Sequence, residues 1–180
     1  MKPLPFAAVP LVLAAVVCGG CSKEEGVDEA LAMAKIGLAD AIDAARAEVG
    51  GGFALEAELE AGDGGPVYTV ELLVDGGVRE VVVDAVGGAV RGTQEIVSSP
   101  EEREVLDAVE DLGREGRISL KKALKRGAED VGGGAAIEVD VELEEGGPAF
   151  VIVYALGEGT REAVVPMRKA ADANEEDAPR

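Results

Sequence analysis

FALEAELEAGDGGPVYTVELLV, residues 53–74, contains two strand-like segments joined by a glycine-rich turn, and its pattern returns in AAIEVDVELEEGGPAFVIVYAL, residues 135–156. In residues 53–60, Phe53, Leu55, Ala57 and Leu59 alternate with mostly acidic residues, as Ile137, Val139, Val141 and Leu143 do in the second stretch. This period of two predicts strands with one buried and one solvated face. A Gly-Gly-Pro turn then leads to a second strand, 67–74 or 149–156, and Asp75-Gly76-Gly77 leads to a third over 78–84.

The two stretches belong to a longer internal repeat. Shifting the sequence by 82 residues, without gaps, places residues 36–83 on 118–165 and aligns the glycine triplets at 50–52 and 132–134. Residues 38–49 carry apolar side chains at spacings of three and four, which predicts a helix that the first triplet ends. The second copy begins its helix at Ser119, a good N-cap. The sequence therefore predicts an α+β protein of two tandem units, each a helix packed on an antiparallel three-stranded meander.

The remaining segments lie before, between and after these two units. Ser99-Pro100-Glu101-Glu102 is typical of a helix start, so a short linker helix is expected within residues 98–116. The expected organisation is a signal peptide over 1–20, a tether and start of the first helix over 21–35, a first domain over 36–97 and a second, more divergent domain over 117–169. Residues 170–180 have no apolar period and are expected to form a disordered acidic tail. Residues 150–156 are apolar on both faces of their strand, so the other unit, the linker helix or a partner should cover the second face.

The N-terminus has the features of an export signal. Lys2 precedes an apolar run over 4–17 that is too short to span a bilayer, and two glycines lead to Cys21, as in a bacterial lipobox. Cys21 is the expected lipidation site and Cys18 a poorer one, and a plain secretory signal or an uncleaved anchor stays an alternative. A lipid with two acyl chains would attach the chain stably to the cell envelope, at the periplasmic side of the outer membrane if the cell has two membranes.

Charge and composition exclude several functions. There are 36 Asp and Glu against 17 Lys and Arg and no histidine, for a net charge of −19. Removing residues 1–20 takes away only Lys2, which leaves −20. Phosphate would repel such a chain, so no nucleic-acid partner is expected, and histidine-dependent catalysis is ruled out. Ser119-x-x-Lys122 formally matches a serine–lysine motif, but its companion motifs are absent and Ser119 is explained as a cap.

The residues also resemble a known family. Gly65-Pro66-Val67-Tyr68-x-Val70, Asp75-Gly76 and Val81-Val82-Val83-Asp84-Ala85-x-x-Gly88-x-Val90 are similar to the PepSY domain, while the second copy departs from that pattern at Pro166-Met167. The resemblance implies a non-catalytic extracytoplasmic module that binds, and in some cases inhibits, peptidases. It implies no catalytic residue and no cofactor.

Three residues are candidates for partner binding: Tyr68, Asp84 and Tyr154. Strand tyrosines more often pack in a core, and an exposed edge strand is another route by which a peptide could bind. The acidic rows Glu56, Glu58, Glu60 and Glu138, Asp140, Glu142 could hold Ca²⁺ or a basic partner, although no calcium-loop motif supports a metal site and a solvated face is the simpler interpretation. The function expected is therefore a membrane-anchored protein that binds another protein, with an acidic cation-binding or sensory envelope component as the alternative.

Overall fold

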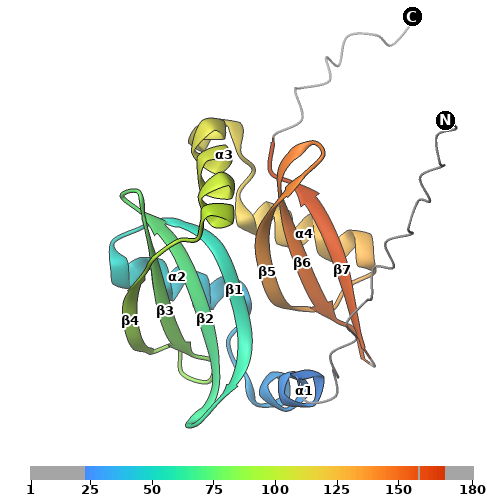
Figure 1. Ribbon diagram of the computed structural model, residues 1–180. Helices are drawn as coiled ribbons and strands as arrows, with labels where there is room; N and C mark the ends of the chain where they lie inside the picture. Colours follow the sequence, from blue (N-terminus) through green and yellow to red (C-terminus); the bar gives the residue numbers. More distant parts are fainter. Residues whose placement is uncertain (1–22, 158, 169–180) are drawn as a thin grey trace, which may run out of the picture.

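The computed structural model describes residues 23–157 and 159–168, so the predicted signal peptide, Cys21, Cys18 and the acidic tail lie outside the described residues. Helices and strands follow one another along the chain (Figure 1) as α1 Lys23–Met33, α2 Leu38–Val49, β1 Phe53–Gly62, β2 Gly65–Val74, β3 Gly77–Asp84, β4 Val90–Ile96, α3 Pro100–Gly116, α4 Leu120–Val131, β5 Ala135–Glu144, β6 Gly147–Ala155 and β7 Thr160–Pro166. The α+β prediction of two helix-and-meander units with a linker helix is confirmed. No helix in the described part of the chain is both long and apolar enough to cross a bilayer.

The seven strands form one antiparallel sheet in the order β4-β3-β2-β1-β5-β6-β7. The two units meet edge to edge where Ala57 pairs with Val139 and Glu58 with Glu138. Ala57 and Val139 are equivalent positions of the repeat, so the units are related by a local two-fold axis through this pair. The units therefore join through strand edges and are not stacked through their apolar faces. Each unit buries the apolar face of its part of the sheet under its own helix, with α2 and α4 behind the sheet in Figure 1.

Backbone contacts show that the two units have the same topology. Ile36 N–H donates to Ala85 O in the first unit, and Ile118 N–H donates to Met167 O in the second. Pro66 and Pro148 each accept a hydrogen bond, from Ala85 N–H and Met167 N–H respectively. Met167 therefore takes the place of Ala85 and is fully buried, so the departure from the family pattern at this point keeps the backbone geometry.

The last glycine of each triplet is needed for close packing. A Cβ at Gly134 would lie 2.6 Å from Ala155 O, and one at Gly52 would lie 3.1 Å from Leu73 O. Ala155 and Leu73 are again equivalent positions. The shared glycine triplet thus ends each helix and also lets the chain pass close to the second strand.

In the second unit, a glycine on α4 makes room for a large side chain on β6. Tyr154 donates from its hydroxyl to Leu124 O at 2.6 Å, and a Cβ at Gly127 would meet that hydroxyl at 2.6 Å. The first unit carries Ala45 and Leu72 at the equivalent positions, both fully buried. The second unit therefore gains a larger strand residue and loses the helix methyl group, which conserves the core volume.

Three local features differ from the sequence-based expectations. Residues 21–35 do not begin the first helix, because α1 is a separate helix that contacts β1 and β2. The first unit has a fourth strand, β4, that was not predicted. In β1 the register shifts between Ala54 and Glu56, so Leu55 is the extra residue of a β-bulge and lies on the sheet face away from α2.

The linker helix α3 lies where the units diverge. The Ser99 hydroxyl caps it by accepting from Glu102 N–H, while the Glu102 carboxylate accepts from Ser99 N–H, as the predicted start requires. Its apolar side packs against β5 and β6, with Val109 fully buried, so the linker helix supplies part of the cover expected for the second unit. Leu106 turns to the first unit and packs with Leu55 and Val78.

Candidate functional site

The edge-to-edge joining of the units collects carboxylates on the sheet face opposite α2 and α4. Glu56 pairs with Glu71 on β2, and Glu71 pairs with Glu80 on β3. Across the seam, Glu58 pairs with Glu138, and the same register places Asp140 beside Glu56. The acidic rows of the two first strands, separate in the sequence, therefore become one cluster around the local two-fold axis.

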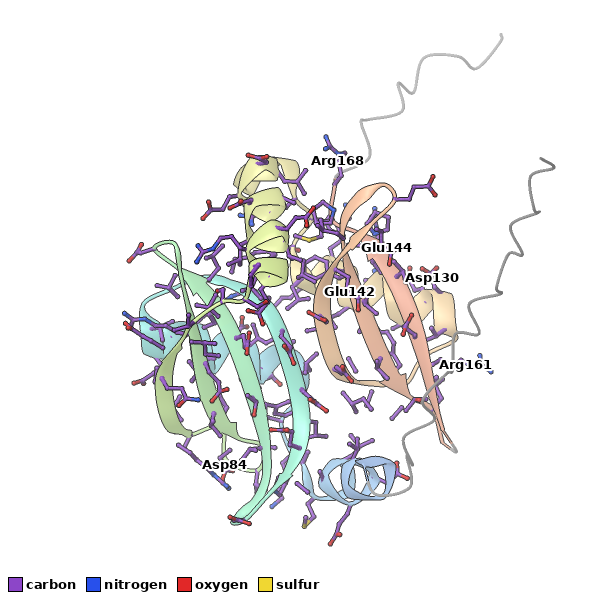
Figure 2. The ribbon with its side chains drawn as sticks, viewed as in Figure 1. Asp84, Asp130, Glu142, Glu144, Arg161 and Arg168 are labelled. Atoms are coloured by element: carbon purple, nitrogen blue, oxygen red, sulfur yellow. The ribbon has the colours of Figure 1, made fainter. Side chains whose placement is uncertain are left out.

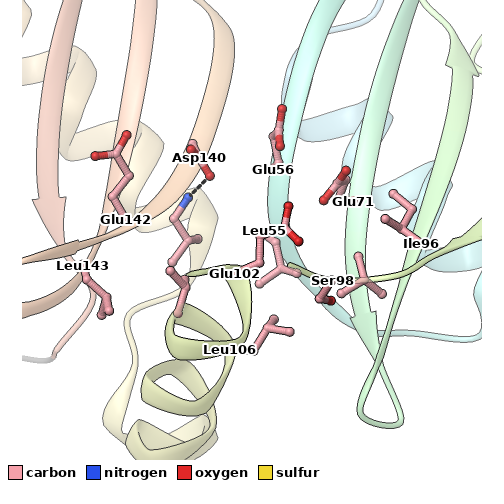
Figure 3. Close-up of a pocket in the computed structure, with 13 residues that line it drawn as sticks. Leu55, Glu56, Glu71, Ile96, Ser98, Glu102, Leu106, Asp140, Glu142 and Leu143 are labelled. Atoms are coloured by element: carbon pink, nitrogen blue, oxygen red, sulfur yellow. Dashed lines mark hydrogen bonds between the residues drawn. The ribbon is translucent and has the colours of Figure 1, made fainter. Parts of the chain in front are cut away.

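A groove of about 390 Å³ lies in this cluster, beneath the start of α3. We call it the seam groove, and Figure 3 shows its walls. Its lining residues are Leu55, Glu56, Glu71, Val78, Ile96, Ser98, Glu102, Val105, Leu106, Asp140, Val141, Glu142 and Leu143. Five of these are carboxylates and none is a lysine or arginine, while most of the remaining walls are aliphatic.

The environment of the groove disfavours charge on its carboxylates. Burial raises the pKa of Glu56 from 4.5 to about 7, and repulsion from neighbouring carboxylates, Glu71 first, acts in the same direction. Burial followed by repulsion from Glu102 raises the pKa of Glu71. Burial also raises the pKa of Asp140, although its carboxylate accepts a hydrogen bond from Val141 N–H at 2.6 Å.

Two carboxylates that line the seam groove are not among the acidic rows that the sequence pattern identified. Glu71 is the one acidic residue of its strand, and its place beside Glu56 depends on strand pairing. Glu102 is in the first turn of α3 and reaches the groove because the linker helix lies over the seam. The alternation of buried and solvated residues along β2 could have identified Glu71, whereas no local pattern predicts that Glu102 lies at the groove.

The two candidate tyrosines lie in the core. Tyr68 and Tyr154 are each 1 % exposed. Tyr68 donates to Ile36 O at 3.2 Å, so each tyrosine ties a strand to the helix side of its unit. The expectation that they contact a partner is wrong, because their bodies and hydroxyl groups are used inside the fold, and the packing interpretation is the correct one.

Asp84 serves the turn after β3. Its carboxylate accepts hydrogen bonds from Val86 N–H at 2.8 Å and Gly87 N–H at 2.6 Å and forms an ion pair with Arg91. The Arg91 hydrogen bond, followed by those two backbone donors, lowers the pKa of Asp84 to about 2. Asp84 lies at the end of its unit that is opposite α3 (Figure 2), so it is remote from the seam groove. A role in partner binding stays a prediction.

The serine–lysine motif, the sheet edges and the possible metal site are the other candidates from the sequence. Ser119 accepts from Lys122 N–H at 3.3 Å, so the serine–lysine motif is a helix cap. Of the strands in the described region, β4 and β7 form the two sheet edges, and β4 is mostly exposed. Peptide addition to these edges stays a prediction. Among the residues that the structure describes, no three His, Cys, Asp or Glu side chains are arranged to hold a metal ion.

A second hollow, on the seam near the start of α4, is lined by cations that have partners. Lys121 forms an ion pair with Asp43 at 2.9 Å, and Arg46 approaches the same carboxylate at 3.8 Å. Arg117 lies over the Phe53 ring, 4.3 Å from its centre. These contacts join the helices and strands of the two units and give the hollow a structural role.

Comparison with known proteins assigns part of the chain. No curated protein matches it. A crystal structure from Clostridium difficile 630, described as "a putative lipoprotein", aligns with 18% identity and a TM-score of 0.45, over 76% of this chain and 89% of that one. Residues 35–94, from just before α2 into β4, match the sequence model of the PepSY family, described as "Peptidase propeptide and YPEB domain". This match covers α2 and the first three strands of the first unit.

Proposed function

We propose that this protein is a non-catalytic module, held outside the cytoplasm by a lipid on Cys21, that binds another protein. The observation that carries the proposal is the PepSY match over residues 35–94, since the family is described by its presence in peptidase propeptides. A peptidase is therefore the partner class we favour, with inhibition or regulation as the consequence of binding. The lack of histidine in the sequence supports a binding role over hydrolysis.

Capture from the cell envelope tests this proposal. The chain from residue 22 onward contains every described helix and strand, and it would be immobilised and exposed to an envelope extract. Washing at about 0.5 M salt removes proteins that adhere only to its negative charge. A retained protein is then purified, tested for direct binding and assayed for peptidase activity with and without the chain.

The expected result is a purified partner that binds directly and whose peptidase activity changes when the chain is added. Direct binding of a partner without peptidase activity would retain the binding role and refute the peptidase assignment. The proposal is overturned if no protein binds directly and no envelope peptidase changes its rate.

Cation binding is a second candidate function, because five carboxylates line the seam groove, although no three of the described acidic side chains are arranged as a preformed metal site. Ca²⁺ prefers six to eight oxygen ligands, and the groove supplies five carboxylate groups. Calorimetric titration with Ca²⁺ separates the two functions. Micromolar affinity that is lost in Glu56→Gln would support cation binding, whereas no heat of binding favours the protein-binding role.

A further inference from the structure

We propose that the seam groove docks an extended segment of the partner protein that presents arginine or lysine side chains between apolar ones. The inference rests on the proposed protein-binding function and adds the chemistry of the partner. It is carried by the combination of aliphatic walls and unneutralised carboxylates in one groove, and not by the acidic residues alone.

Charge complementarity determines the polar part of this segment. The described ion pairs use Asp43, Asp84, Glu95 and Glu129, and none of them involves a carboxylate that lines the groove. Glu56 and Glu71 are half-buried and lie opposite each other on neighbouring strands. A guanidinium or ammonium group placed between them would replace like-charge repulsion with hydrogen-bonded ion pairs.

The apolar walls determine the rest of the segment. Leu55, Val78 and Leu106 form a small cluster of their own, separate from the main core. At the end of the groove formed by β5, the lining residue Leu143 is 40 % exposed. Side chains of a bound segment would cover these groups, which a simple metal ion would leave in water.

The length of the groove sets the length of the segment. Its lining residues come from β4, β3, β2, β1 and β5, five neighbouring strands. Four strand spacings of about 4.8 Å span about 19 Å, which an extended chain of about six residues covers at about 3.3 Å per residue. The occupant is therefore a short extended peptide or loop, and α3 forms one side of its path (Figure 3).

A titration followed by NMR tests the inference with a defined probe. The probe is the peptide acetyl-Leu-Arg-Gly-Leu-Arg-Gly-amide, and its control replaces both arginines by citrulline, which has nearly the same shape without the charge. The protein is the chain from residue 22, labelled with ¹⁵N. We expect the arginine peptide to bind with a Kd of about 1 mM or tighter, to shift the amides of groove residues, and to bind at least about tenfold more tightly than the citrulline peptide.

A pair of variants locates the binding. Glu56→Gln combined with Asp140→Asn should weaken the arginine peptide at least about tenfold. Glu48→Gln combined with Asp130→Asn removes the same charge from exposed positions on α2 and α4 and should leave the affinity within about twofold. Equal weakening by both pairs would show that only the net charge attracts the peptide and would overturn the inference. Amide shifts confined to β4 or β7 would overturn it too, as would no binding at about 1 mM.

The same variants keep this inference separate from the proposed function. If a captured partner binds the groove variant as well as it binds the unmodified chain, the groove assignment fails and the binding function stands. If the peptide binds the groove but no protein partner exists, the proposed function fails. Displacement of the peptide by micromolar Ca²⁺ would identify the groove as a cation site and overturn the peptide as its occupant.

Discussion

Replacing Glu56 by glutamine should stabilise the protein at alkaline pH. Glu56 lies at the seam between the units, with Glu71 opposite on β2 and Asp140 beside it on β5. Folding moves its carboxylate from water into a half-buried place among like charges, which raises its pKa to about 7. Glutamine keeps the shape of the side chain and removes the charge.

The gain in stability expected for Glu56→Gln follows from this pKa. A change from 4.5 to about 7 corresponds to about 3 kcal/mol between the two protonation states for a fully shielded group. Because the side chain of Glu56 is only half-buried, solvent screens the repulsion, and we expect about 1 to 2 kcal/mol. For a domain of this size, that gain raises Tm by about 3 to 6 °C.

The contribution of Glu56 to the free energy of unfolding depends on pH. Since the folded state binds the proton more tightly than the unfolded state, the unfavourable contribution of Glu56 is absent below about pH 4.5, grows as the pH rises and is complete above about pH 7. Urea unfolding at pH 8 should therefore show the full gain for Glu56→Gln. At pH 5, which lies above the isoelectric point of about 4.3, only about a quarter of it should remain.

A control variant and the pH dependence of the stability gain test this prediction. Glu48→Gln changes an exposed carboxylate on α2 and should alter stability by no more than about 0.5 kcal/mol. Equal gains at pH 5 and pH 8 for Glu56→Gln, or a loss at pH 8, would show that folding does not place this carboxylate among like charges.

Three further predictions concern packing, the β3 turn and the membrane anchor. Gly127→Ala should destabilise the protein by about 1 to 3 kcal/mol in urea unfolding, because its methyl group would overlap the Tyr154 hydroxyl. Adding Tyr154→Leu, which recreates the pair of the first unit, should restore most of that loss, and failure of the rescue would contradict the packing argument. Asp84→Asn should lower stability at pH 7, and the difference should shrink as the pH falls below about 4 towards 2, because the stabilisation by the charged carboxylate is lost as Asp84 protonates; a loss independent of pH would count against the ion pair. Cys21→Ala should abolish incorporation of radiolabelled palmitate in cells while Cys18→Ala retains it, and labelling that depends on Cys18 would move the anchor to that residue.

The repeated unit of this fold could be predicted from the amino-acid pattern alone. The exact repeat spacing predicted two copies of one helix and three strands, and the observed bounds of α2 and α4 and of β1 and β5 differ by that same spacing. These predictions succeed because helix periodicity, strand alternation and glycine turns are local properties of the chain. The acidic faces of β1 and β5 were also readable, since the charges occur at alternate positions.

How the units meet and where the groove lies depend on contacts between segments that are distant along the chain. Alternation identifies the face of a strand but not the edge that pairs, so the β1–β5 seam could not be read from the pattern. The bulge at Leu55 adds one residue and reverses the face of the side chain, which a strict period of two misassigns. The strand β4 is mostly exposed on both faces and therefore has no apolar period to detect. Glu102 joins the acidic cluster solely because α3 packs across the seam, a contact between parts of the chain that no local signal encodes.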